Sequence, residues 1–519
     1  MSKFFLKNLD ISLQSAYLKQ NMTKKKFYIT TPIYYSNGVP HIGHAYSSLI
    51  ADTIWGYQRL QGLDVRFSTG VDENSQKVVE SAESLGMETM AYADMMAAQH
   101  RAVWDGIGIR YTDFIRTTET RHRDYVQQVL QQSFDAGDIY EGFYEGLYCV
   151  GCEGFKKESD LVNGNCPDHP NKPLTQLKEK NYFFRLSKYQ DRILKFYEEN
   201  PDFVKPRTRY NEIIEFVRGG LEDFSISRET NKFGIPLPFD ASQVTYVWYD
   251  ALFNYLTVVQ DDEARWWPAD MHVIGKDIVR FHGIYWPAML WSAWYEAPHQ
   301  LLTTGHFTVD GQKMSKSIGN VIDPVAYISE YSRDMLVLYL FTAFPIGEDG
   351  DFSRDQAILT YNAKLSNNLG NLLNRAIALT LKIEGRISGS VWKVWNEKIE
   401  QYISLMEDSD LKGSLELAFA YATEINQYVE ENAPWKISID EDGGREKLEN
   451  ILFILLSNLR KISIMLLPFF DSKMRELLNR IGTPYADDIS LSENLAIDPT
   501  EFYIAEKWEP LYMRIAPTV

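Results

Sequence analysis

Two histidines, His41 and His44, stand three residues apart behind a segment of aromatic and β-branched residues at 27–35. That segment predicts a strand, and we expect a helix after it, with Pro40 at the first helical position. The histidines would then share one face near the helix N-terminus. Free N–H groups and the positive end of the helix dipole favour phosphate there. Gly43 would let a ligand lie close to the backbone.

A second cluster combines all three cysteines of the chain with a histidine. Two-residue spacers separate the members of each pair, Cys149 with Cys152 and Cys166 with His169. Three thiolates and one imidazole suit a tetrahedral Zn²⁺ site. Four protein ligands leave no open position, so the expected role is structural. Three cysteines are too few for a disulfide scaffold at this length, which favours a reducing compartment.

A basic loop forms the third cluster, in which Lys313 and Lys316 lie among small residues. Taken alone, this loop is also compatible with a solvated turn. Together, the segments 41–44 and 313–317 resemble the two signatures of class I aminoacyl-tRNA synthetases. The flanking residues are most similar to the methionyl-tRNA synthetase family, and the resemblance runs from about residue 27 to near the end of the chain.

The resemblance implies a two-step reaction. The carboxylate of methionine attacks the α-phosphate of ATP and pyrophosphate leaves, and the methionyl group then passes to the terminal ribose of tRNA(Met), including the initiator tRNA, at the 2′-hydroxyl. Histidines would donate hydrogen bonds to the phosphates, lysines would neutralise the β- and γ-phosphates, and Mg²⁺ would enter with ATP. The implied ATP-binding residues are His41, Gly43, His44, Lys313, Ser315, Lys316 and Ser317, and both histidines and both lysines would be catalytic.

The resemblance also implies an amino-acid pocket and an anticodon-binding surface. Asp72 would pair with the α-ammonium of methionine. Leu252 stands where one branch of the family has proline, which we interpret as a minor departure. The other implied amino-acid-binding residues are Ile33, Tyr35, Trp248, Ala251, Tyr255, Asp277, Ile278 and His282. Single-stranded RNA is read by stacking and by hydrogen bonds to base edges, and the implied anticodon-contacting residues are Asn371, Arg375 and Trp435.

Strand-like segments alternate with helical patterns on both sides of a long interruption. This order predicts an α/β fold, with a Rossmann-like parallel sheet and ligands beyond the carboxyl ends of its strands. No Gly-x-Gly-x-x-Gly fingerprint or P-loop is present, which disfavours NAD and P-loop functions. Leucines at helical spacing later in the chain predict an all-α bundle. The expected division is an N-terminal extension (1–25), a catalytic domain (26–138 and 244–305), a connective insertion with a single zinc knuckle (139–243), a lysine-loop junction (306–359) and a helical anticodon-binding domain (360–519).

Composition bounds the function further. The formal net charge of −18 over 519 residues argues against general, charge-driven binding to nucleic acid. No apolar run reaches the length of a membrane span, so no membrane partner is expected. Residues 1–21, which precede a second methionine, Met22, lack the apolar core of a secretory signal. We expect a disordered tail or an over-long start assignment in place of an organelle address, and a cytoplasmic protein. The extra carboxyl-terminal domain of many dimeric relatives is missing, which favours a monomer.

Two alternatives stay open at this point. A cysteine-specific class I enzyme usually holds zinc inside the catalytic site, which a closed four-ligand knuckle disfavours. A non-catalytic tRNA-binding relative would have no need of both signatures.

Overall fold

The structure is a computed structural model that describes residues 25–149, 154–156, 158, 161–167, 170–229, 233–314, 319–389 and 396–516. The predicted extension 1–25 therefore lies outside the described residues, apart from its last residue. Cys152, His169 and the loop residues 315–317 also lie outside them. The backbone of Lys313 is described, but its side chain is not.

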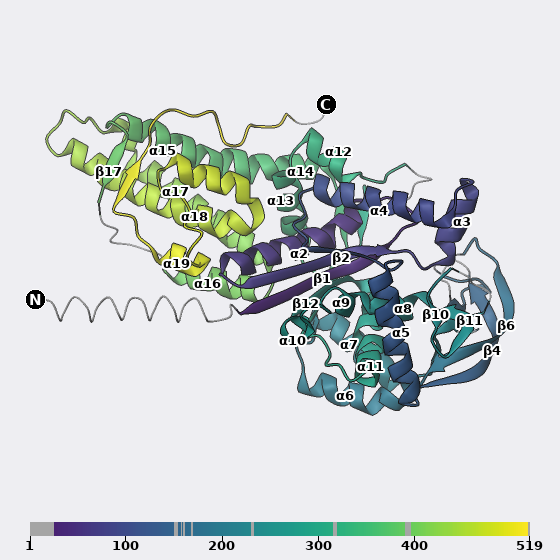
Figure 1. The fold of residues 1–519 in the computed structure, drawn as a ribbon. Helices are drawn as coiled ribbons and strands as arrows, with labels where there is room; N and C mark the ends of the chain where they lie inside the picture. Colours follow the sequence, from purple (N-terminus) through teal and green to yellow (C-terminus); the bar gives the residue numbers. More distant parts are fainter. Residues whose placement is uncertain are drawn as a thin grey trace, which may run out of the picture.

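A six-stranded parallel sheet forms the centre of the molecule (Figure 1). Its strand order is β3-β2-β1-β12-β13-β7, and every neighbouring pair is parallel. From β1 the chain adds β2 and β3 toward one edge of the sheet, whereas β12 and β13 lie toward the other edge. The boundary between β1 and β12 is therefore the switch point where α/β sheets bind ligands. The predicted Rossmann-like sheet is confirmed. The strands are β1 (Lys26–Tyr35), β2 (Asp64–Asp72), β3 (Asp113–Arg116), β7 (Val204–Lys205), β12 (Met271–Gly275) and β13 (Leu301–Thr304).

Helices connect and cover these strands. Helix α2 follows β1 directly and is buried along most of its length, because it packs on the sheet on one side and on the helical region on the other. The helices of the first half are α2 (Ile42–Leu60), α3 (Gln76–Ser84), α4 (Thr89–Gly106) and α5 (Thr120–Asp135). Those of the second half are α8 (Val247–Leu252), α9 (Asn254–Thr257), α10 (Glu263–Trp266), η3 (Lys276–Ile278), η4 (Phe281–Tyr285) and α11 (Trp286–Ser292).

The region between the two halves contains mainly antiparallel ribbons. One sheet has the order β5-β4-β6-β8, and another has the order β10-β11-β9. One short strand, β7, leaves this region and pairs with β13 at the edge of the central sheet, which the sequence did not predict. The elements are β4 (Ile139–Cys149), β5 (Gly154–Lys156), β6 (Leu174–Phe184), η2 (Leu186–Tyr189), α6 (Gln190–Glu199), α7 (Arg207–Arg218), β8 (Phe224–Ser225), β9 (Ser227–Arg228), β10 (Pro236–Leu237) and β11 (Asp240–Thr245).

A three-stranded sheet of order β15-β14-β16 lies between the central sheet and the helical region along the chain. Strands β14 and β15 form a hairpin, and β16 pairs in parallel with β14. The elements of this link are β14 (Phe307–Val309), β15 (Gln312–Lys313), α12 (Pro324–Glu330), α13 (Arg333–Ala343), β16 (Gly350–Phe352) and α14 (Arg354–Tyr361).

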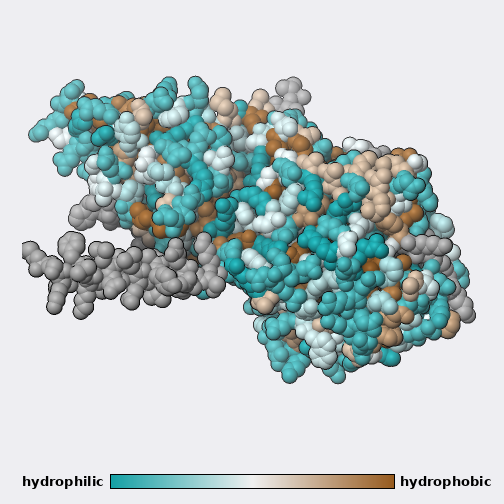
Figure 2. All heavy atoms as spheres, in the orientation of Figure 1, coloured by the Kyte–Doolittle hydropathy of each residue, from teal (hydrophilic) through white to brown (hydrophobic). Residues whose placement is uncertain are grey.

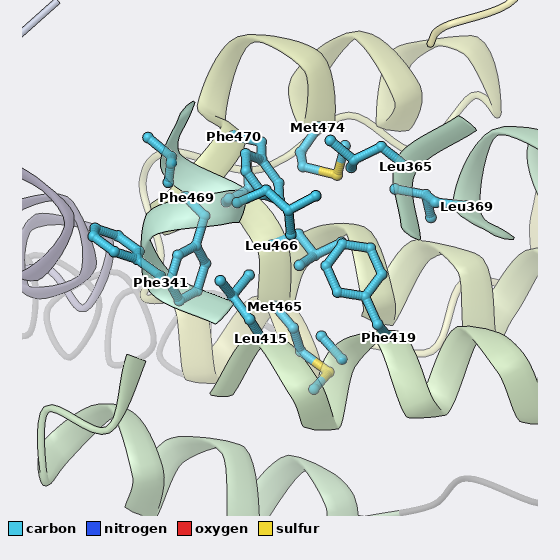
Figure 3. Packing of buried hydrophobic residues seen from close by; sticks show 14 of the residues in the cluster. Phe341, Leu365, Leu369, Leu415, Phe419, Met465, Leu466, Phe469, Phe470 and Met474 are labelled. Carbon is cyan, nitrogen blue, oxygen red and sulfur yellow. The ribbon is translucent and has the colours of Figure 1, made fainter. Parts of the chain in front are cut away.

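The predicted helical region follows, on the side of the central sheet away from the antiparallel ribbons (Figure 1). Its core is aromatic and aliphatic, and Figure 3 shows Phe341 of α13 and Phe419 of α17 close to side chains of α18. One apolar cluster includes residues of both this region and the central sheet. The elements are η5 (Asn362–Gly370), α15 (Asn371–Leu381), β17 (Arg386–Ser388), α16 (Asn396–Glu407), α17 (Leu411–Asn432), η6 (Pro434–Lys436), α18 (Gly444–Arg480), α19 (Leu491–Ala496) and β18 (Glu501–Tyr503).

Helix α18 is the single helix among the described residues that is long and apolar enough to cross a membrane. Within the fold, 94% of its apolar window is buried, as expected of a core helix. Figure 2 shows mostly hydrophilic residues on this face of the helical region.

Candidate functional site

A cleft of about 1190 Å³ opens at the carboxyl ends of β1, β2, β12 and β13. This is the switch point of the sheet, where the fold favours ligand binding. Most of the residues that the sequence assigned to ATP and the amino acid lie along it. The cleft is lined by Ile33, Tyr35, His41, Gly43, His44, Asp72, Trp248, Ala251, Tyr255, Asp277, Ile278 and His282, among others.

The histidine pair caps helix α2. His41 is the N-cap residue, and its Nδ1 accepts the N–H of Gly43 at 3.1 Å. His44 accepts the N–H of His41 through its own Nδ1 at 3.2 Å, so the two imidazoles form a reciprocal capping box. The prediction that Pro40 occupies the first helical position is wrong, because the helix begins at Ile42. Capping by His41 fixes the start of the helix two residues later.

This capping determines where each ring carries its proton. An Nδ1 that accepts a hydrogen bond is unprotonated, so the proton of the neutral ring lies on Nε2. Burial, and next the neighbouring His41, lower the pKa of His44 to about 3. His44 is therefore a neutral hydrogen-bond donor at physiological pH. The ring centroids of the pair lie 4.0 Å apart, which suits two donors to one phosphate group.

A second part of the cleft is aromatic. The Tyr255 hydroxyl lies 2.8 Å from Nε2 of His282, and Nδ1 of His282 lies 3.0 Å from the carbonyl oxygen of Ile278. Because a carbonyl only accepts, Nδ1 carries the proton, and the hydroxyl donates to Nε2. Burial lowers the pKa of His282 to about 4. Trp248 stacks on Phe281 at 4.1 Å, which completes an apolar wall.

Asp72 ends β2 at the floor of the cleft and is buried. It pairs in register with Tyr35 of β1, and its carbonyl oxygen accepts the N–H of Ser36 at 3.1 Å. These backbone bonds hold a carboxylate near the apolar wall. An ammonium group bound there would meet an opposite charge in a partly desolvated place.

Met314, which follows Lys313, lies at the start of the histidine helix. An added Cβ at Gly43 would stand 3.3 Å from Cε of Met314, so this methionine contacts the start of α2 directly. Lys313 belongs to strand β15, which pairs with Thr308 of β14. The structure thus brings the two signature segments together as far as Met314, and the side chains of residues 315–317 lie outside the described part.

Several residues along the cleft were not predicted from the sequence. His100 on α4 is buried, lies 3.0 Å from the carbonyl oxygen of Gly38, and has its pKa lowered to about 4 by burial. Thr308, Asp349 and Asp351 come from the link between the sheets. A lone histidine on a helix carries no spacing signal, and the two aspartates are brought here by long-range pairing alone.

Cys149 and Cys166 represent the predicted zinc ligands within the described residues. Both are fully buried. Cys149 ends β4, and Cys166 follows a tight turn at Asn163-Gly164, where both residues have positive φ. A buried thiol at the end of β4 and another after the Asn163-Gly164 turn fit a metal knuckle by their donor chemistry. Among the described residues, no group of three or more metal-binding side chains occurs, and the other two predicted ligands, Cys152 and His169, lie outside them.

The three predicted anticodon residues lie in the helical region, far along the chain from the cleft. Asn371 and Arg375 are one helical turn apart on α15. The guanidinium of Arg375 lies 5.8 Å from the ring centroid of Trp435, and it also forms an ion pair with Glu430. Trp435 is 42% exposed, and it lies three residues after Asn432, the last residue of α17. The fold therefore presents an accessible indole beside an arginine.

Comparison with known proteins agrees with this architecture. The family model described as tRNA synthetases class I (M) matches residues 27–173 and 169–377. A methionine–tRNA ligase from Rickettsia felis is 42% identical over 478 residues, covering 88% of this chain and 92% of the relative. One from Nostoc sp. is 38% identical over 531 residues, covering 96% and 99%. The solved Mycobacterium tuberculosis methionyl-tRNA synthetase in complex with methionyl-adenylate is 33% identical with a TM-score of 0.90, covering 94% of this chain and 100% of that chain.

The parallel sheet, the capped histidine pair and the matched family model define a class I aminoacyl-tRNA synthetase. Within this class, the chain belongs to the methionyl-tRNA synthetase family. The cysteine-specific alternative is thereby set aside.

Proposed function

We propose that this protein joins methionine to tRNA(Met) in two steps. In the first, a carboxylate oxygen of methionine bonds to the α-phosphorus of ATP, and the bond to pyrophosphate breaks. In the second, a ribose hydroxyl of the tRNA attacks the carbonyl carbon of the adenylate, loses its proton, and AMP leaves. Both steps depend on placement and on charge stabilisation more than on a covalent nucleophile.

One observation carries this proposal: a single cleft combines an apolar slot next to a carboxylate with two neutral imidazole donors at a helix N-terminus. Tyr255, His282 and Trp248 would hold the thioether side chain, and Asp72 the ammonium. His41 and His44 would donate from Nε2 to the phosphates. Lys313 and Lys316 would neutralise the departing pyrophosphate, and Asn371, Arg375 and Trp435 would read the anticodon.

Two metal ions belong to the proposal. Mg²⁺ would arrive bound to ATP and neutralise phosphate charge. Cys149, Cys152, Cys166 and His169 would hold one structural Zn²⁺, since three thiolates and one imidazole fill a closed tetrahedral shell. We further propose a monomer that acts in the cytoplasm, with the domain boundaries predicted from the sequence.

The decisive experiment is amino-acid-dependent exchange of labelled pyrophosphate into ATP, measured with each of the twenty amino acids and without tRNA. Exchange with methionine alone is the expected result. Exchange with another amino acid would contradict the pocket assignment and leave the class intact. No exchange with any amino acid would contradict activation in the absence of tRNA and favour a non-catalytic role.

A lysine variant tests the phosphate role. Lys316→Ala should reduce methionine-dependent exchange about 100-fold or more, because it removes a charge that is aimed at the transition state. Its affinity for tRNA(Met) should change little. Lys447→Ala is the matched control, because this lysine is exposed on α18. Equal losses of exchange and of tRNA binding in Lys316→Ala would refute the assignment.

A further inference from the structure

The connection between the central sheet and the β14–β15 hairpin is very short. Strand β13 ends at Thr304 and β14 begins at Phe307, so only Gly305 and His306 separate them. The chain just before β16 crosses over this connection. A Cβ at Gly305 would stand 1.9 Å from the carbonyl oxygen of Glu348, so the crossing requires glycine. The hairpin is therefore joined to the central sheet by a two-residue link that the chain before β16 contacts closely.

The Asp349 carboxylate ties three segments together at this connection. Lys276, just beyond the end of β12, donates to its two oxygens at 2.7 and 2.5 Å. The backbone N–H of His306 donates to Oδ1 at 2.9 Å. Burial raises the pKa of Asp349, but the His306 N–H and Lys276 outweigh it, and the pKa lies below its ordinary value. The carboxylate is thus charged and binds groups from two other segments.

The next acidic residue continues this arrangement into the hairpin. Asp351 of β16 accepts the Thr308 hydroxyl at 2.6 Å and the N–H of Gly311 at 2.7 Å. Gly311 belongs to the two-residue turn between β14 and β15, where positive φ favours Asp-Gly. Strand β16 therefore sets the position of the hairpin, and the hairpin contains Lys313.

We infer that Asp349 is a positioning residue for the activation step, which acts by holding the β14–β15 hairpin at a fixed orientation to the catalytic cleft. The inference rests on the proposed function for the role of Lys313. Asp349 has no place among the residues that the family resemblance implied, and it acts here through Lys276 and His306.

A purely structural role is the competing explanation, and the exposure argues against it. The side chain of Lys276 is 24% exposed and that of Asp349 is 57% exposed. Ion pairs this close to solvent add little to the free energy of unfolding. The ion pair instead fixes the position of the hairpin. Displacement of a catalytic group by about 1 Å costs up to about 100-fold in rate.

Hydrogen exchange tests the geometric part without reference to activity. Asp349→Ala removes both contacts and should accelerate exchange of the β14 amides about tenfold or more. Asp349→Asn keeps an acceptor for His306 and should have a smaller effect. Glu330→Gln is the matched control, because Glu330 forms an exposed 3.8 Å ion pair with Arg354 in the same linking region. Unchanged exchange at β14 in both Asp349 variants would overturn the inference.

Kinetics test the functional part. Asp349→Asn should lower the rate of methionine-dependent pyrophosphate exchange between about 10- and 100-fold at saturating substrates. Single-turnover transfer from preformed adenylate to tRNA should stay within about twofold, because pyrophosphate has already left. Asp349→Glu keeps the charge and should recover most of the rate. Equal losses in both steps, or an unchanged activation rate, would overturn the inference, whereas absence of exchange in the unaltered protein would instead contradict the proposed function.

Discussion

At the scale of single residues, this molecule depends on histidines that are buried and neutral. Burial lowers the pKa of His44 and His122 to about 3, and that of His100 and His282 to about 4. A neutral imidazole can donate from one nitrogen and accept at the other, which the capping box and the Tyr255 contact both use. A charged ring would lose the acceptor and break either arrangement.

The same burial gives a prediction for stability against pH. Unfolded histidine titrates near 6.5, so the unfolded state binds more protons than the folded state between about pH 6.5 and 4. Stability from each such histidine is therefore fully present above that range and falls as pH falls. For His122 the loss between pH 7 and pH 4 should be on the order of 3 kcal/mol.

Urea denaturation at several pH values tests this through a variant. His122→Gln removes the titrating group, although it also leaves Thr257 without its imidazole partner at 3.0 Å. The stability of this variant should depend less on pH than that of the unaltered protein over the same range. His299→Gln, at an exposed position, is the control. Parallel pH curves for the His122 variant and the unaltered protein would contradict the prediction.

At the scale of elements, the sequence predicted well whatever depends on local pattern. The strand beginning at Phe27, the helix over Ser75–Leu85 and the end of α17 before Trp435 all follow from residue spacing. The sequence failed where pairing is long-range. Strand β7 has two residues and is defined by its partner β13. The helix begins at Ile42 and not at Pro40, because the His41 side chain caps it.

Candidate residues follow the same division. His41 and Lys313 belong to contiguous signatures, so spacing and resemblance found them. Asp349 and His100 reach the cleft through the crossing of β16 and the packing of α4, and no local pattern marks either one. Prediction from a single sequence is therefore strongest for contiguous motifs and weakest for supports built by tertiary structure.

The ribbon formed by β4 and β6 gives a prediction about metal. The purified protein should contain about one zinc ion per chain, because two of the four predicted ligands, Cys149 and Cys166, are buried thiols. His169→Ala should lower the zinc content or the zinc affinity, and His299→Ala should not. Atomic emission analysis after dialysis against a chelator measures this, and a metal-free protein of unchanged stability would contradict it.

At the scale of the whole molecule, the two recognition tasks that we propose would lie in different regions that share one apolar core. The cleft lies at the central sheet, whereas Trp435 is exposed in η6 of the helical region. Under the proposed function, activation without tRNA would need the first region, and charging would need both. Substitutions in the helical region should therefore separate the two activities.

Trp435→Ala should lower kcat/KM for charging of tRNA(Met) about 10- to 100-fold, since stacking of one base on an aromatic ring contributes about 1–3 kcal/mol. Methionine-dependent pyrophosphate exchange should not change. Trp508→Ala is a matched control, because its side chain is 41% exposed against 42% for Trp435. Equal effects of the two substitutions on charging would argue against an anticodon role for Trp435.

Helix α2, which presents the histidine pair, packs against α18, and about 400 residues of chain separate them. During synthesis, the ribosome must add this length before the partner exists. At about 5–20 residues per second, roughly 20 to 80 seconds pass between the synthesis of α2 and that of α18, which covers its apolar side. All six strands of the central sheet are made by Thr304, so the nascent chain must hold α2 on a finished sheet without this partner until residues 444–480 are added. The helix that presents the first signature is therefore packed on its second side only late in synthesis.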